Sequence, residues 1–218
     1  MTTNRLKYPR TFHAPWTLEK TADDKTHSPA DMQAMFEGRE VVVTEKLDGE
    51  NTTIYPDGTT HARSLDSAFH PSRAWIRKFA AEVGYQIPEG WRLCGENMFA
   101  LHSIGYDKLP SYFMLFHIFN EANDALSWDE VEEYAEMLGC ITVPVLWRGI
   151  YDEEAIKACW SGISQYGTES EGYVIRVADR FSFEDFGRST AKMVRAGHVQ
   201  TDEHWMDKAV VPNGVIDG

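Results

Sequence analysis

One lysine of this chain stands in a setting suited to covalent chemistry. Lys46 lies within the run Thr-Glu-Lys-Leu-Asp-Gly at residues 44–49, directly after the apolar residues 41–43. A strand that ends in an Asp-Gly turn presents its last side chain at a fixed place, and a lysine amine held in this way can act as a nucleophile. A hairpin turn with a solvated lysine is the alternative, because so short a pattern also occurs by chance.

Other side chains suited to such chemistry follow Lys46 along the chain. They are Arg63, Glu96, Phe116, Glu171, Lys192 and Arg195. Cationic neighbours would disfavour the ammonium form of Lys46, lower its pKa, and neutralise charge on a phosphorylated substrate. Each of these residues also has a plainer interpretation, from a solvated strand end to core packing in the apolar run around Phe116.

The elements that must position these residues interleave without a regular βαβ period. Helices are expected at 28–36 and 71–83, from residue 127 to 138, and from residue 152. Strands are expected at 41–46, 51–55, 59–63, 91–96, 112–119, 143–147, 173–177 and 190–195. The strand at 112–119 is apolar on both faces, which predicts a central position, and Ser-Trp-Asp-Glu at 127–130 is a capping box. The candidate residues therefore fall on strands or at strand ends.

In this order the motifs resemble those of the covalent nucleotidyltransferases, the superfamily of DNA ligases, RNA ligases and mRNA capping enzymes. The motifs are Lys-Leu-Asp-Gly at 46–49, Arg-Ser at 63–64, Gly-Glu-Asn at 95–97, the aromatic strand at 112–119, Glu-Gly-Tyr-Val-Ile-Arg at 171–176 and Ala-Lys-Met-Val-Arg at 191–195. Within the superfamily the chain is most similar to ATP-dependent RNA ligases of the phage RNA ligase 2 type and their bacterial relatives. The segments 8–11 and 197–201 also resemble bacterial members.

The resemblance implies a role for each motif residue. Lys46 would attack the α-phosphate of ATP and carry AMP as a phosphoramidate. AMP would then pass to the 5′-phosphate of an RNA end, and a 3′-hydroxyl would displace it. The implied catalytic residues are Lys46, Arg63, Glu171 and Lys192. The implied nucleotide-binding residues are Glu45 through its backbone, Lys46, Arg63, Glu96 on the ribose hydroxyls, Phe116 on the adenine face, Glu171, Lys192 and Arg195.

The expected metal is Mg²⁺, with Mn²⁺ as a possible substitute, held by Asp48 and Glu171 through water. Two positions depart from the family pattern. His117 stands where related ligases often carry an acidic residue, and Val194 fills the position of a second lysine in the last motif. On a strand Lys192 and Val194 share one face and the next residue faces the other way, so Lys192 is the preferred phosphate contact and Arg195 is a candidate for the RNA strand.

Composition predicts a single domain over residues 1–218, and the resemblance implies that it is a nucleotidyltransferase domain. About twenty residues follow the last motif, too few for the C-terminal OB domain of DNA ligases and capping enzymes, and residues 202–205 are expected to lie in a closing helix. No apolar run is long enough to cross a bilayer and no secretory signal opens the chain, which predicts a cytoplasmic protein. Cys94, Cys140 and Cys159 form no Cys-x-x-Cys pair, so buried thiols are expected.

The formal net charge of −13 argues against a non-specific nucleic-acid binder, because Lys and Arg supply most of that affinity. Acidic residues crowd 129–136 and 152–154, whereas cations fall near the candidate site and predict a local basic groove on an acidic body. These cations are Arg63, Arg73, Arg77, Lys78, Lys192 and Arg195. A partner protein is a further expected source of grip on the RNA.

We therefore predict an α+β fold in which antiparallel sheets flanked by helices form an ATP-grasp-like nucleotidyltransferase core with the nucleotide in a central cleft. The predicted function is ATP-dependent sealing of RNA ends, as in RNA repair, on nicked duplexes or single strands. One alternative keeps lysine adenylylation and assigns DNA or a capped RNA end as acceptor. Another is a nucleotide-binding regulatory protein without turnover. The departures at His117 and Val194 favour it, and the intact Lys46, Glu171 and Lys192 oppose it.

Overall fold

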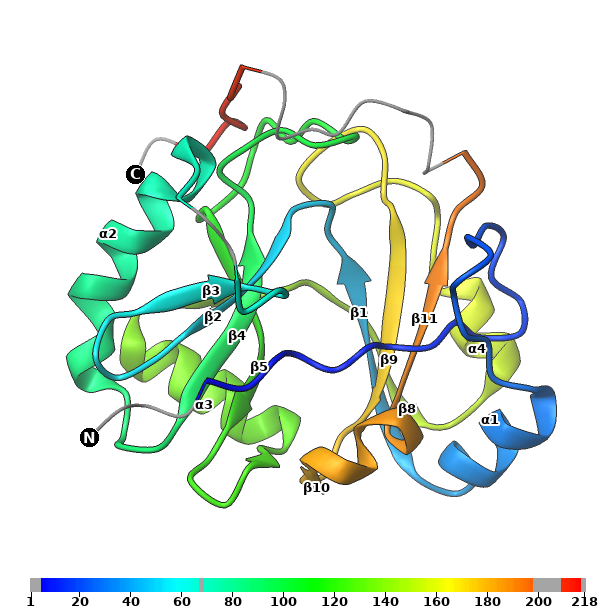
Figure 1. Ribbon diagram of the computed structural model, residues 1–218. Coiled ribbons are helices and arrows are strands. Elements are labelled where there is room, and N and C mark those ends of the chain that lie inside the picture. Colours follow the sequence, from blue (N-terminus) through cyan, green and yellow to red (C-terminus); the bar gives the residue numbers. More distant parts are fainter. Residues whose placement is uncertain (1–4, 67–68, 198–208, 217–218) are drawn as a thin grey trace.

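The computed structural model describes residues 5–66, 69–197 and 209–216, and its chain forms two β-sheets that stand side by side (Figure 1). Sheet A consists of β1 (Glu40–Lys46), β8 (Val145–Ile150), β9 (Gly172–Val177) and β11 (Thr190–Val194). Sheet B consists of β2 (Glu50–Ile54), β3 (Thr60–Ala62), β4 (Arg92–Asn97), β5 (Phe113–Phe119), β6 (Asp124–Ala125), β7 (Ile141–Thr142) and β10 (Phe181–Ser182).

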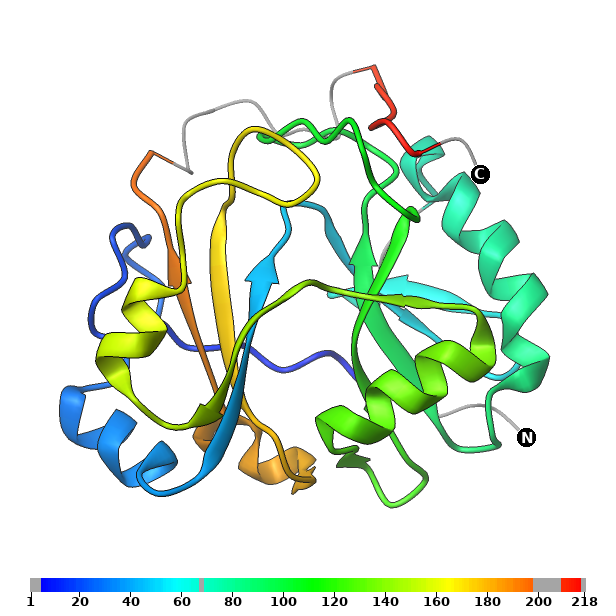
Figure 2. The same cartoon turned by 180° about the vertical axis from the view of Figure 1, so that it is seen from behind.

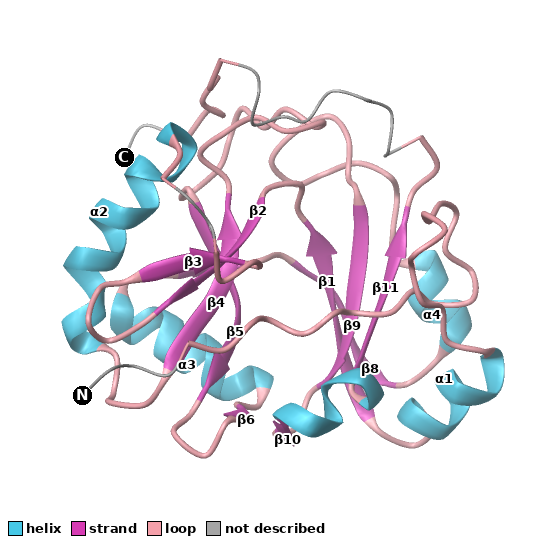
Figure 3. Ribbon diagram, in the orientation of Figure 1, coloured by secondary structure: helices cyan, strands magenta, loops and turns pink. Residues whose placement is uncertain are grey.

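Helices flank the two sheets, as the colouring by secondary structure shows (Figure 3). The α-helices are α1 (Pro29–Phe36), α2 (Ala74–Val83), α3 (Trp128–Leu138) and α4 (Glu153–Ala158). The 3-10 helices are η1 (Pro71–Arg73), η2 (Gly84–Gln86) and η3 (Phe183–Arg188). Helices α2 and α3 lie beside sheet B, and α1 and α4 lie beside sheet A (Figures 1 and 2). The predicted α+β fold is confirmed.

The strand order brings together segments that are distant in sequence. Sheet A has the order β11-β9-β1-β8, and sheet B has the order β10-β6-β5-β4-β2-β3 with β7 beside β5. The pairs along both orders are antiparallel, and β7 pairs parallel with β5. The strand predicted to be central, β5, has neighbours on both sides. The two-residue strands β6, β7 and β10 were not predicted, since they are too short to show a period.

Local signals explain where the helices begin and end. Ser28 caps α1 in a capping box with Asp31, and Ser127 caps α3 in a second one with Glu130. Gly139 ends α3 in the left-handed conformation, with φ of 64°. The helix expected at 71–83 forms as η1 followed directly by α2.

Two hydrophobic clusters stabilise the fold, one mainly of sheet B and one mainly of sheet A, and each also contains strand residues of the other sheet. The cluster of sheet B includes apolar side chains of α2 and α3, and that of sheet A includes Phe36 of α1 and Ile156 of α4. Phe116 packs against both clusters. The buried Arg176 of β9 ties the sheets together, since it donates to the carbonyl of Leu126 at 2.6 Å and to that of Phe116 at 3.4 Å. Hydrogen bonds of one buried side chain therefore help to fix the position of the two sheets relative to each other.

The N-terminal segment crosses from sheet B to sheet A, and we call residues 5–18 the strap (dark blue in Figure 1). On the sheet B side the Leu6 N–H donates to the Tyr55 hydroxyl at 2.9 Å. On the sheet A side the Lys192 N–H donates to the Phe12 carbonyl at 2.9 Å, and the Ala14 N–H donates to the Lys192 carbonyl at 2.7 Å. The strap thus continues sheet A beside β11.

The three cysteines are free thiols; Cys94 and Cys140 are buried and Cys159 is half-buried. Within residues 5–66, 69–197 and 209–216, none of the helices is both long and apolar enough to span a bilayer. The closing helix expected at 202–205 lies outside the described residues, as does most of the segment 197–201.

Candidate active site

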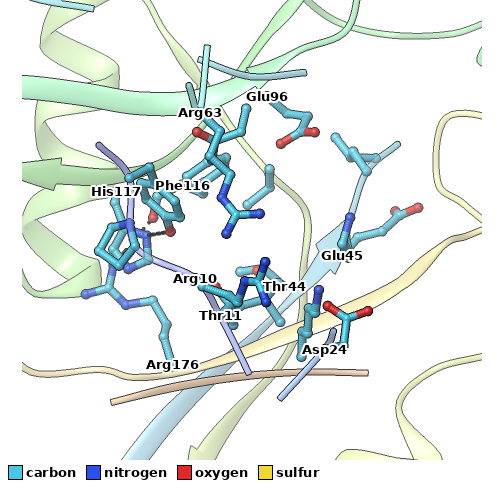
Figure 4. Close-up of a pocket in the computed structure, with 18 residues that line it drawn as sticks. Arg10, Thr11, Asp24, Thr44, Glu45, Arg63, Glu96, Phe116, His117 and Arg176 are labelled. Carbon is cyan, nitrogen blue, oxygen red and sulfur yellow. Dashed lines mark hydrogen bonds between the residues drawn. The ribbon is translucent and has the colours of Figure 1, made fainter. Parts of the chain in front are cut away.

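A pocket opens between the two sheets beneath the strap (Figure 4). Six of the predicted site residues line it, namely Glu45, Lys46, Arg63, Glu96, Phe116 and Lys192. They come from strands β1, β4, β5 and β11 and from the segment after β3. Residues separated by almost 150 positions in sequence therefore share one cavity.

Lys46 forms an ion pair with Glu171 inside this site. Its Nζ lies 2.5 Å from Glu171 Oε2, and the Glu171 side chain is 4% exposed against 25% for Lys46. The pair forms because Lys46 lies opposite Gly172 in the β1–β9 ladder. Gly172 also lies opposite Val194 of β11, with φ of 151°, and a Cβ there would come within 2.0 Å of the Met193 carbonyl oxygen. Glycine at this position is what lets β9 approach β11 directly beside the lysine.

Register places a second lysine on the same face of sheet A. Lys192 lies opposite Val174, which lies opposite Thr44, and Thr44 and Lys46 are two residues apart on β1. Side chains two residues apart point to the same side of a strand, so both lysines face the pocket. The next cation, Arg195, lies outside the pocket lining and pairs with Glu169 at 3.0 Å.

The expectation that cations lower the pKa of Lys46 is wrong for the nucleotide-free protein. Burial acts to lower this pKa, but the negative charges of Glu171 and Glu96 outweigh it, and the pKa is raised. The lysine with the lowered pKa is Lys192, at about 8, because of its burial and then the charge of Lys46. A hydrogen-bonded carboxylate acts on Lys46 more strongly than the cations of the same pocket.

Asp48 anchors a loop under the lysine turn. Its Oδ2 accepts hydrogen bonds from the backbone N–H groups of Ser103 at 2.7 Å and Ile104 at 2.8 Å, and its own N–H donates to the Tyr106 hydroxyl at 2.9 Å. The side chain is buried. One oxygen of this predicted metal ligand is thus already engaged by the protein, as Glu171 Oε2 is by Lys46.

Glu96 approaches the lysine turn from sheet B. Its Oε1 accepts a hydrogen bond from the Gly49 N–H at 3.2 Å. A Cβ at position 49 would lie 2.6 Å from the Asn97 carbonyl oxygen, so the turn needs glycine to come this close. Burial raises the pKa of Glu96 to about 8, opposed by Lys46 and reinforced by Glu171. A largely protonated carboxyl can both donate to and accept from hydroxyl groups.

Phe116 reaches the pocket because of a β-bulge. The β4–β5 register shifts between Cys94 and Gly95, so that Cys94 pairs with His117 and Gly95 with Leu115. Phe116 is the extra residue, and such a bulge re-aims a side chain out of the regular alternation. The ring is half-buried and lines the pocket. The resemblance, and not the sequence pattern, pointed to this residue, and the bulge that turns it toward the pocket was not predicted.

His117 is part of a buried aromatic cluster. Its Nδ1 lies 2.9 Å from the Tyr8 hydroxyl, and rings of Phe119 and Phe186 surround it with centroids less than 6 Å away. Burial, and then the charge of Arg176, hold its pKa well below the ordinary value. His117 is therefore neutral and anchors the strap, and it supplies none of the negative charge expected at this position from the resemblance.

The predicted basic groove is only partly present. Arg63 and Lys192 line the pocket, whereas Arg73 is buried in an ion pair with Glu50. The guanidinium of Arg77 lies over the Phe69 ring, 5.0 Å from its centroid. Sequence position alone assigned Arg73 and Arg77 to the groove, but an ion pair and a cation–π contact within the protein hold their side chains.

The sequence analysis assigned no role to several residues that the structure brings to the pocket. Arg10, Thr11 and Asp24 come from the N-terminal region, and Arg176 comes from β9. The run Tyr-Pro-Arg-Thr at 8–11 was the available signal for the first two. Sequence spacing gave no indication that this segment crosses between the sheets, because the hydrogen bonds that place it there join it to Tyr55, His117 and Lys192, which are distant in sequence.

Glu45 lines the pocket, but one of its two backbone groups is already engaged. Its backbone N–H donates to the Pro144 carbonyl at 2.8 Å, so this group is not available to an adenine edge without breaking that bond. Its side chain accepts a hydrogen bond from the Gln165 N–H at 3.4 Å. Burial raises the pKa of this carboxyl. The side chain is buried and forms its hydrogen bond within the protein.

Two antiparallel sheets that enclose a pocket with a lysine at a strand end are the architecture expected of the covalent nucleotidyltransferases. The model of the family described as RNA ligase matches residues 39–194, and the chain belongs to this family.

Solved structures with a similar fold include a Naegleria gruberi RNA ligase with PPi. The TM-score is 0.58 with 22% identity, over 78% of this chain and 53% of that one. Substituted forms of Naegleria gruberi RNA ligase are also similar. The form with ATP and Mn has a TM-score of 0.55 and 19% identity, and the form with AMP and Mn has 0.55 and 20%; each covers 76% of this chain and 52% of that one. This chain spans about half the length of these enzymes, and at such identities the likeness shows the fold. No curated protein matches the chain.

Proposed function

We propose that this chain is an ATP-dependent RNA ligase that joins 3′-hydroxyl and 5′-phosphate RNA ends through AMP bound to Lys46. One observation carries the proposal: the lysine that ends β1 faces a pocket, pairs with the buried Glu171, and shares that pocket with Lys192 and Arg63. Membership of the RNA ligase family supports it. The single nucleotidyltransferase domain expected from the sequence is part of the same proposal.

In the first step Lys46 Nζ attacks the α-phosphorus of ATP and pyrophosphate leaves. The amine must be neutral to attack, yet its pKa is raised in the free protein by Glu171 and Glu96 despite burial. Binding of ATP and a metal has to offset these carboxylates. Arg63 and Lys192 then stabilise the negative charge that develops on the leaving pyrophosphate.

The carboxylates around Lys46 suit a hard divalent cation. Among the described residues, no three or more His, Cys, Asp or Glu side chains are grouped as a metal site. This fits Mg²⁺ or Mn²⁺, which needs one or two protein carboxylates when substrate phosphates and water complete its shell. Glu171 would hold the ion, with Asp48 contributing through water. A cation bound there supplies positive charge that neutralises Glu171 and so lowers the pKa of Lys46.

Sheet B supplies the contacts to the nucleoside. Phe116 offers its half-buried ring to the adenine face, and the protonated Glu96 hydrogen-bonds the ribose hydroxyls. Glu45 is left with its backbone carbonyl for any contact to the base, since its N–H is engaged. Arg195, which lies outside the pocket, is assigned to the RNA strand.

After adenylylation, AMP passes from Lys46 to the 5′-phosphate of an RNA end and a 3′-hydroxyl displaces it. The formal net charge of −13 gives the protein little general attraction for RNA phosphates. We therefore infer that a partner protein contributes grip on the RNA. We place the reaction in the cytoplasm, as the sequence analysis expects. The proposed substrates are RNA ends in nicked duplexes or in single strands.

The first test is the intact mass of the purified protein after incubation with ATP and Mg²⁺, beside Lys46→Ala. Wild type is expected to gain one AMP and the variant none. Prior treatment with pyrophosphate and Mg²⁺ removes AMP that the protein already carries. If wild type gains no AMP after this treatment, a nucleotide-binding protein without turnover becomes the better interpretation.

The second test uses a panel of nicked and single-stranded substrates, each with RNA or DNA on either side of the junction. Sealing that requires RNA at the junction supports the proposed ligase. Equal sealing of all-DNA nicks would assign DNA as the acceptor instead. The Lys46→Ala protein is the control for contaminating ligase.

A further inference from the structure

Arg10 of the strap lies in the pocket, and the proposed mechanism does not use it. Two contacts fix its position, one through the neighbouring backbone and one through its own side chain. Two residues later the strap is hydrogen-bonded to the backbone of Lys192, and Arg10 Nη1 itself donates to the Asp23 carbonyl at 2.7 Å. Arg10 is thus an exposed residue that lines the pocket and is held in place by these contacts.

Arg10 faces other cations across the pocket. Figure 4 shows its side chain and that of Arg63 directed into the same part of the cavity. The two are close enough that burial and then the charge of Arg10 lower the pKa of Arg63. Lys192 lines the same cavity, and its pKa is lowered by burial and then by Lys46, with Arg63 adding to the effect.

The carboxylate nearest to these cations is Asp24, which follows the strap. Its Oδ2 lies 3.5 Å from His13 Nε2, and its charge acts on both Arg63 and Lys192. Glu171 also acts on Lys192, but it forms an ion pair with Lys46. Asp24 alone does not balance Arg10, Arg63 and Lys192, and like charges gathered in a pocket are unfavourable unless an anion joins them. The arrangement thus fits a ligand with several negative charges.

We propose that Arg10 binds the β- and γ-phosphates of ATP and serves the adenylylation of Lys46 rather than the sealing of RNA. The inference rests on the proposed function of the pocket. In adenylylation the bond between the α- and β-phosphates breaks, the Nζ–phosphorus bond forms, and pyrophosphate leaves with its charge held by Arg10, Arg63 and Lys192. In sealing the 3′-hydroxyl displaces AMP, and no β- or γ-phosphate is present.

The test separates these two steps. Arg10→Ala and Arg10→Lys are compared with wild type in single-turnover adenylylation at increasing ATP concentration, and in sealing of a pre-adenylylated RNA strand without ATP. For Arg10→Ala we expect the ATP concentration at half-maximal rate to rise about 10- to 100-fold, with a smaller rise for Arg10→Lys, which keeps the charge and loses the bidentate fork. Sealing should stay within about threefold of wild type.

Lys7→Ala is the matched control, since Lys7 is an exposed cation of the same strap outside the pocket lining. It should leave both steps unchanged. Unaltered ATP dependence in Arg10→Ala, or an equal loss in both steps with a lower melting temperature, would overturn the proposal and assign Arg10 a purely structural role.

A binding measurement keeps this inference separate from the proposed function. Calorimetric titration of the Lys46→Ala protein with ATP and with AMP needs no turnover. Adding Arg10→Ala should weaken binding of ATP about 10-fold or more and leave AMP unchanged. Equal weakening of both nucleotides contradicts a β,γ-phosphate contact, whereas absence of AMP transfer in wild type contradicts only the ligase proposal.

Discussion

The two walls of the pocket are built in different ways. On sheet A, Lys46, Glu171 and Lys192 belong to three neighbouring strands, β1, β9 and β11, or to the residue directly before one of them. On sheet B, Glu96 and Phe116 are placed by separate local features, a glycine contact and a β-bulge. Sheet A thus presents a coupled set of charges, and sheet B presents individual contacts.

This difference has an energetic consequence. Charges in adjacent strands act on one another, so that Glu171 raises the pKa of Lys46 while Lys46 lowers that of Lys192. Substitutions among them should be strongly non-additive and should alter the reaction itself. Phe116 contacts the nucleotide through its ring face, so its substitution should alter nucleotide affinity more than the rate of the chemical step.

The largest effect is expected for Glu171→Gln on sheet A. Loss of its charge removes the proposed metal-holding carboxylate and the partner that orients Lys46, and we expect single-turnover adenylylation to slow by about 100-fold or more. Glu169→Gln is the control, because Glu169 is exposed and pairs with Arg195 at the surface. It should react at the wild-type rate.

If Glu171→Gln reacts as fast as wild type, the reaction needs the carboxylate neither to hold the metal nor to orient Lys46. The claim that the charges of sheet A act together in the reaction is then wrong. The pH dependence sharpens this outcome. Because Glu171 raises the pKa of Lys46, its removal should shift the rising limb of the residual rate toward lower pH.

A smaller effect, confined to affinity, is expected for Phe116→Ala on sheet B. Stacking of an aromatic ring on a base contributes about 1–3 kcal/mol, so the ATP concentration at half-maximal rate should rise about 10- to 100-fold while the maximal rate changes little. Phe116→Trp should retain most of the affinity. A fall in the maximal rate at unchanged ATP dependence would contradict the division of roles between the sheets.

Glu96→Gln should change stability in a pH-dependent way. A carboxyl whose pKa is raised from 4.5 to about 8 by burial favours the fold in its neutral form; that contribution is complete below pH 4.5 and is lost as the pH rises through 8. Glutamine is neutral throughout and still accepts from the Gly49 N–H. In urea unfolding we expect the variant to gain up to about 4 kcal/mol over wild type between pH 5 and pH 8.5. A constant difference across this range would contradict the raised pKa.

The smallest effect is expected for Arg195→Ala. Its ion pair with the exposed Glu169 contributes at most about 1 kcal/mol, and its side chain lies outside the pocket lining. Adenylylation should remain within about twofold of wild type, as measured by single-turnover kinetics, and only sealing of RNA should weaken. A large loss of adenylylation would move Arg195 back among the nucleotide-binding residues.

The candidate site could be predicted from sequence where a local pattern also fixes geometry. Alternation along a strand predicts different directions for Lys192 and Arg195, and the structure places Lys192 in the pocket lining and Arg195 outside it, just beyond the end of β11. The same alternation could not reveal the bulge at Phe116, since a bulge is a property of the pairing with β4 and not of β5 alone.

Electrostatics was the least predictable property. The sequence supplied the cations near Lys46, but the sign of its pKa shift depends on which charge is closest. Glu171, 125 residues away along the chain, lies 2.5 Å from the amine. Burial acts to lower the pKa of Lys46, but this carboxylate together with Glu96 outweighs burial and raises it.

The sequence by itself determined the order of the motifs, the helix caps and the strands that carry the chemistry, because these depend on local spacing and periodicity. Tertiary structure alone decided that Asp48 anchors a loop, that His117 is a neutral buried anchor, and that the strap brings Arg10 to the pocket. Each of these outcomes depends on contacts between segments far apart in the chain, whose distances and burial no local pattern specifies.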